Sequence, residues 1–238
     1  MRTILIVNDD GIAADGICRL AEAAKAFGEV WVVAPDGQRS GVSHSITMHS
    51  PLDVVPHAFP VADVHAFACS GSPADCVRVG CLNIVPRKPD VVLCGINCGY
   101  NVASDIQYSA TAGAAFEAAF QGCHSIALSE DIGQSHAVTD HYLHEILTEL
   151  LEKPLAAGQI WNVNFPACPL SECGGILRER FVSRSVPLRD HYNVIEQLDG
   201  GGVRLMIEPD FDKTCEEGSD YHAVLEKYVS VGLVYNIR

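Results

Sequence analysis

Two adjacent acidic residues, Asp9 and Asp10, are the strongest candidates for chemistry in this sequence. They follow the apolar run Thr3 to Val7 and precede Gly11. Two ionised carboxylates about 5 Å apart repel by roughly 3 kcal/mol at an effective dielectric constant near 20, and a divalent cation removes this repulsion. Oxygen ligands favour Mg²⁺, Mn²⁺ or Ca²⁺ over zinc. The alternative is that one aspartate caps the following turn, which is common before glycine.

Other polar residues follow the ends of two further predicted strands. Ser40 comes after the apolar segment 29–34, and Asn97 and Asn101 come after segment 90–94. Because ligands bind beyond the carboxyl ends of strands in open α/β sheets, these side chains should meet Asp9 and Asp10 at one edge. The Ser40 hydroxyl and the Asn97 amide oxygen could then complete a cation's coordination sphere. Taken singly, each is more often a turn residue or a helix cap.

Three features suit a phosphate group at the same edge. The segment Gly95–Asn101 can present backbone N–H groups. A helix that begins near Ser109 and Thr111 offers its positive N-terminus. Arg39 could pair with a phosphate oxygen, although a single arginine is usually a surface residue. The Walker phosphate loop and the Gly-x-Ser-x-Gly nucleophile motif are absent from the sequence.

Alternating apolar segments position these residues. The pattern predicts an α/β fold, a three-layer, mostly parallel sheet with helices on both faces. An irregular stretch separates the second and third predicted strands, and we expect 161–165 to be the last strand of the main sheet. The predicted strands are 3–7, 29–34, 90–94, 125–128 and 161–165, and the predicted helices are 17–27, 111–121 and 137–153.

Beyond Pro166 the segments become short and hairpin-like, at 202–207 and 228–231, and Asp199–Gly202 is predicted to be a turn. We interpret residues 1–238 as a single domain. It has a core of residues 1–169 and a β-hairpin-rich C-terminal extension of residues 170–238. The extension is expected to pack on the sheet or on another subunit, which makes it a candidate oligomerisation element.

Composition restricts the classes of partner. The 238 residues carry a formal net charge of −14, which disfavours duplex nucleic acid and acidic membranes. No apolar run approaches the roughly 20 residues of a membrane helix, and the start lacks the features of a signal peptide, so we expect a cytoplasmic protein. The ten cysteines include no Cys-x-x-Cys pair and are expected to be reduced.

Several motifs stand in a fixed order along the chain, namely Asn8–Ile12, Val33–Asp36, Ser40–Thr47, Ser70–Cys76, Gly95–Asn97, Tyr108–Ala114 and Asn162–Pro166. In their types and order they resemble the SurE family, the stationary-phase survival proteins and nucleotidases, over residues 1 to about 166. Beyond residue 170 the resemblance is weaker and is confined to Gly218–Asp220 and Tyr228–Val231.

This resemblance implies a metal-dependent phosphomonoesterase acting on nucleoside 5′-monophosphates, and in some members on 3′-monophosphates. It also implies a Rossmann-like core, an exchanged C-terminal portion, and a homodimer or homotetramer. One divalent cation per subunit, Mg²⁺ or Mn²⁺, is expected. The implied metal ligands are Asp9, Asp10, Ser40 and Asn97. The phosphate-binding residues are expected to be Ser40, Gly41, Asn97, Asn101, Ser109 and Thr111, and the catalytic residues Asp9, Asp10, Asn97 and Ser109.

Two departures from the family pattern are Ala110, where glycine is usual, and Ser72, where threonine is usual. A methyl group at position 110 could crowd the phosphate, or be harmless if φ is negative there. Two other functions stay open. One is a phosphatase that forms an aspartyl-phosphate, although that chemistry usually uses an Asp-x-Asp motif. The other is a nucleotide-binding module without catalysis.

Overall fold

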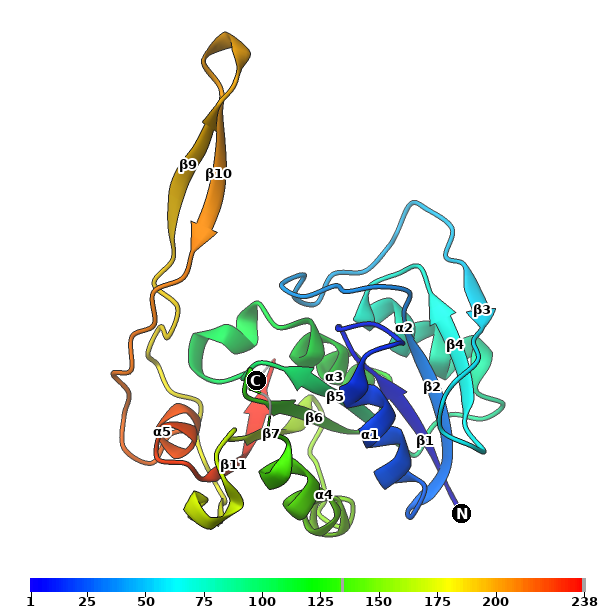
Figure 1. Ribbon diagram of the computed structural model, residues 1–238. Coiled ribbons are helices and arrows are strands. Elements are labelled where there is room, and N and C mark those ends of the chain that lie inside the picture. Colours follow the sequence, from blue (N-terminus) through cyan, green and yellow to red (C-terminus); the bar gives the residue numbers. More distant parts are fainter. Residues whose placement is uncertain (134, 237–238) are drawn as a thin grey trace.

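The computed structural model describes residues 1–133 and 135–236, and in this part of the chain one nine-stranded sheet forms the centre of the molecule (Figure 1). The strand order is β3-β4-β2-β1-β5-β6-β7-β11-β8. The strands are β1 (Arg2–Val7), β2 (Gly28–Pro35), β3 (Val54–Pro56), β4 (His65–Cys69), β5 (Val91–Cys98), β6 (His124–Glu130), β7 (Gln159–Phe165), β8 (Ile176–Leu177) and β11 (Val229–Tyr235).

The middle of the sheet is parallel, from β4 through β2, β1, β5 and β6 to β7. Central strand β1 is apolar on both faces, and its residues from Ile4 to Val7 are fully buried. Parallel sheets are covered on both faces by helices, which explains such continuous apolar runs. The predicted α/β class is therefore confirmed.

Helices cover both faces of this sheet (Figure 1). Ile4 and Ile6 of β1 belong to the apolar cluster that includes α1 and α4. Leu5 and Val7, which point to the other face, belong to the cluster that includes α2 and α3. The helices are α1 (Asp15–Ala24), α2 (Pro73–Val79), α3 (Ala110–Phe120), α4 (Ala137–Leu150) and α5 (Asp220–Leu225), with short turns η1 (Gly80–Ile84), η2 (Ala103–Gln107), η3 (Leu170–Glu172) and η4 (Asp199–Gly201).

Strands β9 (His191–Gln197) and β10 (Val203–Glu208) form a separate antiparallel hairpin that stands clear of the sheet (Figure 1). The predicted turn is confirmed, with Gly200 at φ 77°. Every residue of both strands is exposed. The exposed apolar side chains on the two strands are Tyr192, Val194, Ile195, Val203, Leu205, Met206 and Ile207.

Two expectations were wrong. Strand 161–165 does not end the sheet, because β11 pairs antiparallel with β7, with Ser230 opposite Asn164. The segment 228–231 therefore belongs to the main sheet. The irregular stretch also contains regular structure, namely β3, β4 and α2. The N-cap of α2 is Ser72, in a capping box with Asp75.

Among the described residues, no helix is long and apolar enough to cross a membrane. All ten cysteines are free thiols, and five of them are buried.

Candidate active site

The chain turns sharply where β1 ends. The side chain of Asn8 donates from Nδ2 to the Gly11 oxygen at 2.9 Å and accepts from the Gly11 nitrogen at 3.2 Å. Gly11 has φ 99°, a conformation that L-residues rarely adopt. Asp9 and Asp10 therefore lie in a turn rather than in a strand, which is the condition under which both carboxylates can leave the same edge of the sheet.

Asp9 is the buried member of the pair, with 3% of its surface exposed. Its Oδ1 accepts a hydrogen bond from the Thr111 hydroxyl at 2.6 Å. Burial raises the pKa of Asp9 to about 6, with a further contribution from the charge of Asp10 and an opposing one from the Thr111 hydrogen bond. The ionised form is therefore costly here unless a positive charge compensates it.

Asp10 is partly buried and is held by a different element. Its Oδ2 accepts a hydrogen bond from the backbone N–H of Cys98, at the end of β5, at 3.0 Å. Burial raises the pKa of Asp10, the Cys98 hydrogen bond opposes that shift, and the charge of Glu130 adds to it. Each aspartate is thus oriented from one neighbouring element, Asp9 from α3 and Asp10 from β5.

A cavity of about 250 Å³ opens at this edge. Asp10 and Thr111 do not line it. Asp10 lines a neighbouring hollow of about 220 Å³, and Cys98 borders both spaces. Thr111 is fully buried behind Asp9. The other predicted site residues do line the cavity, and they are Asp9, Ser40, Gly41, Asn97, Asn101 and Ser109.

Asn97 reaches the cavity through an irregularity in β5. The register between β5 and β6 shifts between Cys94 and Asn97, and the Gly95–Ile96 peptide is cis. A Cβ atom on Gly95 would lie 2.2 Å from the Leu128 oxygen, so this position requires glycine. The Asn97 Nδ2 donates to the Gly99 oxygen at 2.7 Å. Because that bond uses the amide nitrogen, the amide oxygen is the atom that can face a cation.

Asn101 is fixed by two asparagines of β7. Its backbone oxygen accepts from Nδ2 of Asn162 at 2.8 Å and from Nδ2 of Asn164 at 3.2 Å, and its N–H donates to Asn164 Oδ1 at 2.8 Å. Its own side chain donates to the Ser129 hydroxyl at 2.7 Å. The Asn162–Pro166 motif thus has a positioning role that the sequence did not reveal.

Ser109 caps α3 at the cavity wall. Its hydroxyl oxygen accepts from the Ala112 N–H at 3.0 Å, so its hydrogen can be donated to a ligand. Ala110, the first residue of α3, is fully buried and has a negative φ. This is the condition under which the methyl group is expected to be harmless.

Three cavity residues were not predicted, since Cys98, Gly99 and Tyr100 belong to the predicted segment Gly95–Asn101. Asp105 lies in η2, Tyr108 directly follows η2, and Leu188 comes from the C-terminal extension. Tyr108 directly precedes Ser109 in a motif that the sequence had singled out, so that motif was a usable signal. Nothing local in the sequence connects Leu188 to this edge of the sheet, because it is far from the other lining residues along the chain.

The donor chemistry fits a hard divalent cation. Two carboxylates, one hydroxyl and one amide are all oxygen ligands, which Mg²⁺ and Mn²⁺ accept. Among the residues that the structure describes, no cluster of three or more His, Cys, Asp or Glu side chains could hold a metal ion. A cation at Asp9 and Asp10 would therefore depend on the neutral oxygens of Ser40 and Asn97 and on water.

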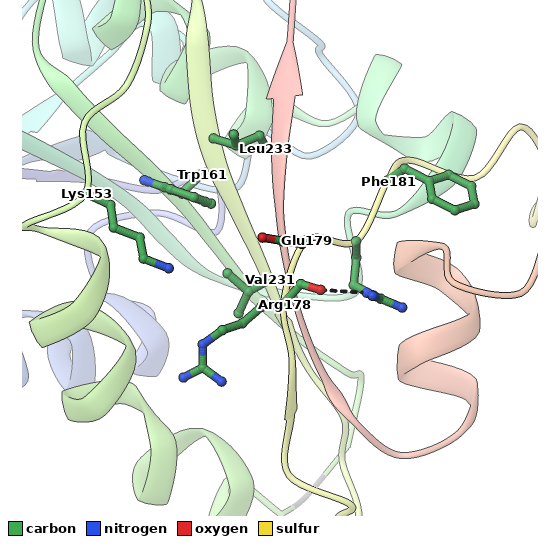
Figure 2. A pocket seen from close by; sticks show the side chains of 8 residues that line it. Lys153, Trp161, Arg178, Glu179, Phe181, Val231 and Leu233 are labelled. Atoms are coloured by element: carbon green, nitrogen blue, oxygen red, sulfur yellow. Dashed lines mark hydrogen bonds between the residues drawn. The ribbon is translucent and has the colours of Figure 1, made fainter.

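A second cavity, of about 450 Å³, lies beside β7 and β11 (Figure 2). It is lined by three cationic side chains, but two of them are paired. Arg178 and Lys153 each contact Glu149 at 2.6 Å, and these contacts lower the pKa of Glu149 to about 2. The Trp161 Nε1 is closed off from solvent. Because Glu149 pairs with two of the three cationic side chains, this cavity is a weaker candidate for binding phosphate than its lining suggests.

Comparison with known proteins gives a consistent result. The family model "Survival protein SurE" matches residues 4–186. The 5′-nucleotidase SurE of Aeromonas hydrophila subsp. hydrophila is 38% identical over 232 residues, covering 96% of this chain and 90% of the relative. That of Pelobacter propionicus is 37% identical over 235 residues, covering 96% and 91%. The crystal structure of SurE protein from Aquifex aeolicus superposes with a TM-score of 0.80 at 36% identity, covering 98% of this chain and 93% of that one.

Proposed function

The chain belongs to the SurE family, and from this premise we propose that it is a 5′-nucleotidase that hydrolyses nucleoside 5′-monophosphates to nucleoside and phosphate. Nucleoside 3′-monophosphates are a second candidate substrate. The observation that carries the proposal is the cavity at the strand ends, where a buried carboxylate, Asp9, meets hydroxyl and amide groups and the start of α3. Such a combination suits a cation together with a phosphate.

We propose that one divalent cation per subunit, Mg²⁺ or Mn²⁺, is held by Asp9, Asp10, Ser40 and Asn97. When bound, the ion supplies Lewis-acid stabilisation of charge on the phosphate oxygens. The Asp9 side chain lines the cavity, and Asp10 would supply its ligand oxygen from the neighbouring hollow. The raised pKa values of both carboxylates support this assignment, because a cation would offset the cost of keeping them ionised.

The phosphate would lie against the N-terminus of α3, whose dipole favours negative charge. Ser109 can donate its hydroxyl hydrogen to a phosphate oxygen, since its oxygen already accepts from Ala112. Asn101, fixed by β7, lines the same wall. At the rim, Tyr108 is 67% exposed and offers an aromatic face to a nucleoside. These groups hold and orient the substrate for attack by water.

The direct test is phosphate release from AMP and GMP with Mg²⁺ or Mn²⁺. The proposal predicts turnover that EDTA abolishes and added Mn²⁺ restores. Binding of AMP without phosphate release would instead support a non-catalytic module. A stable adduct between an aspartate and beryllofluoride would support the aspartyl-phosphate alternative. The adjacent aspartates, held from two different elements, argue against that alternative.

We also propose that the C-terminal extension, residues 170–238, mediates assembly into a homodimer or homotetramer. A two-stranded hairpin is marginally stable by itself in water, and contiguous exposed apolar surface marks interaction sites. The hairpin β9–β10 combines both properties. Ten free thiols suit a reducing compartment, which supports the cytoplasm as the location.

A further inference from the structure

The loop that carries Ser40 and Gly41 has little structure of its own. Residues 36–53, between β2 and β3, contain no helix or strand and are largely exposed. At the start of the loop, the backbone N–H of Arg39 donates to the backbone carbonyl oxygen of Asp9 at 2.7 Å. A cation ligand on such a loop needs further anchors, because a displacement of about 1 Å is enough to weaken a site.

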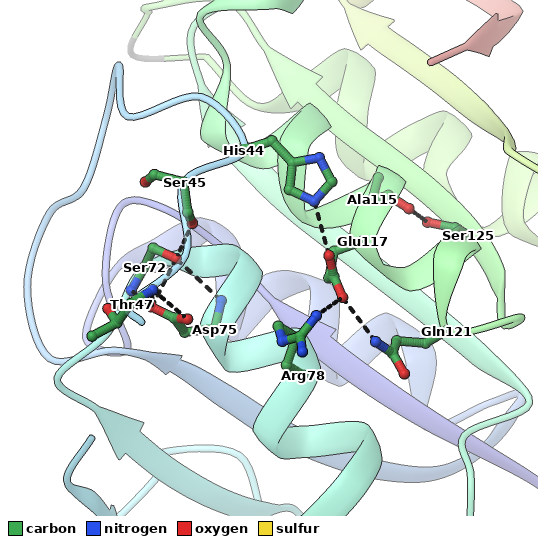
Figure 3. Close-up of polar contacts among 10 residues, drawn as sticks. All are labelled: His44, Ser45, Thr47, Ser72, Asp75, Arg78, Ala115, Glu117, Gln121 and Ser125. Carbon is green, nitrogen blue, oxygen red and sulfur yellow. Dashed lines mark hydrogen bonds and ion pairs between the residues drawn. The ribbon is translucent and has the colours of Figure 1, made fainter. Parts of the chain in front are cut away.

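One anchor is a buried carboxylate on α3, Glu117, which is 4% exposed (Figure 3). Its Oε2 lies 3.0 Å from Nε2 of His44, which belongs to the loop. Its Oε1 accepts from Arg78 of α2 at 3.0 Å and from Gln121 at 2.8 Å. An ionised carboxylate only accepts hydrogen bonds, so the His44 Nε2 carries the hydrogen.

One turn before Glu117, the loop lies directly on the helix backbone. A Cβ atom on Gly113 would be 2.7 Å from the Ser43 oxygen and 2.9 Å from the His44 Cα. Ser43 is itself held by its hydroxyl, which donates to the Gln107 oxygen at 2.7 Å, and by its N–H, which donates to the Tyr108 oxygen at 3.0 Å. Residues 43 and 44 are therefore the point at which the loop is seated on α3.

We propose that His44 is a positioning residue that fixes Ser40 and Gly41 over the cavity through its hydrogen bond to Glu117. The inference rests on the proposed function, because Ser40 is a proposed cation ligand. Its physical basis is that a single helix, α3, contacts both the cavity and the loop. The N-terminus of α3 provides Ser109 to the cavity, and Glu117, two turns later, holds the loop.

The chain provides a matched control, because Arg78, which belongs to α2 and not to the loop, donates to the other oxygen of the same carboxylate. We therefore compare His44→Ala, His44→Gln and Arg78→Gln. His44→Ala should raise the Mn²⁺ concentration for half-maximal AMP hydrolysis about 10-fold, because removing a residue that orients a metal ligand weakens metal binding by about that factor. His44→Gln, whose amide can still donate to Glu117, should recover most of this loss. Arg78→Gln should stay within about twofold of the unaltered protein, even where its melting temperature falls.

An equal rise in the Mn²⁺ requirement for Arg78→Gln and His44→Ala would overturn the proposal, since Glu117 would then act only through stability. Unchanged metal dependence in His44→Ala would also overturn it. Hydrogen exchange of the backbone amides of residues 39–46 is a second measurement that does not depend on activity. The exchange of these amides should be faster in His44→Ala and unchanged in Arg78→Gln. If the unaltered protein releases no phosphate, the proposed function fails while hydrogen exchange still decides the role of His44, and unchanged exchange in His44→Ala refutes it.

Discussion

The carboxyl edge of the sheet and the hairpin β9–β10 depart from the usual distribution of side chains in opposite directions. At the edge, polar groups such as Asp9, Asn97 and Asn101 are buried. On the hairpin, apolar groups such as Leu205 and Met206 are exposed. Buried polar groups and large exposed apolar surfaces are the informative exceptions in a folded protein. Under the proposed function, a cation with phosphate would bind in the first region, and another copy of the chain would cover the second.

The two regions also differ in how they are held. The edge is fixed from within the chain by hydrogen bonds from Thr111, Cys98 and the asparagines of β7. The hairpin pairs only with itself among the sheets of the described residues. A site built in this way is ready for its ligand before binding, whereas the proposed assembly would give the hairpin the contacts that an isolated two-stranded hairpin lacks.

The largest effect should come from Asp9→Asn. Replacing a cation ligand removes charge that a neutral amide cannot supply, so AMP hydrolysis should fall by more than about 100-fold. Circular dichroism should show an intact fold. The matched control is Glu22→Gln, an exposed acid in α1 that lines neither cavity, which should retain full activity. Comparable turnover in the Asp9 and Glu22 variants would remove the edge from the proposed chemistry.

A charge on the hairpin should act on assembly instead. Burying a leucine contributes about 1.5–3 kcal/mol, and a two-fold assembly contains it twice, so Leu205→Glu should weaken association about 100-fold or more. Light scattering after size-exclusion chromatography measures the subunit number. Leu82→Glu, on exposed η1, is the control and should leave that number unchanged. An assembly that persists in the Leu205 variant would exclude the hairpin as the interface.

Thr111→Val tests the support behind Asp9 and should have an intermediate effect. The change keeps the shape of the side chain but removes the hydrogen bond to Asp9, so we expect activity at limiting Mn²⁺ to fall about 10-fold. The control is Ser125→Ala, which also removes a buried hydrogen bond to α3, at the Ala115 oxygen, but lies away from the cavity. Equal losses in the two variants would mean that Thr111 acts only through stability.

The smallest effect concerns pH. The pKa of Asp9 in the fold, about 6, exceeds its ordinary value of 3.8, so the native state binds more protons between these values. Its contribution to stability therefore falls as pH rises through this window. A bound cation should stabilise the ionised Asp9 carboxylate at high pH. Mn²⁺ should therefore raise the melting temperature more at pH 7.5 than at pH 5. A difference of the opposite sign, or one that persists in Asp9→Asn, would contradict this assignment.

Much of the fold could be predicted because it is written in local patterns. Continuous apolar runs such as Ile4 to Val7 predicted the parallel strands, and the rule on strand ends predicted which polar residues would meet. Helix α2 was missed although its signal, Ser72 followed three residues later by Asp75, was present. Strand β4, His65–Cys69, is short, and its apolar run Ala66–Cys69 contains no β-branched residue, so its strand signal was weak.

The features that escaped prediction depend on contacts distant along the chain. The pairing of β11 with β7 joins segments more than 60 residues apart, and no local pattern specifies that contact. For the same reason, the sequence could not show that Leu188 lines the cavity or that Asp10 faces a separate hollow. The contact between His44 and Glu117 likewise joins a motif residue to a helix residue 73 positions later, and no local pattern connects the two.

The proposed chemistry requires one divalent ion held at the end of β1 by both aspartates. The most direct measurement is anomalous X-ray scattering from crystals of the full chain soaked in MnCl₂. We predict a single strong peak per subunit, within ligand distance of oxygens from Asp9, Asp10, Ser40 and Asn97. A peak elsewhere, or none, with the two aspartate side chains pointing apart and Asp9 bound only to Thr111, would contradict it.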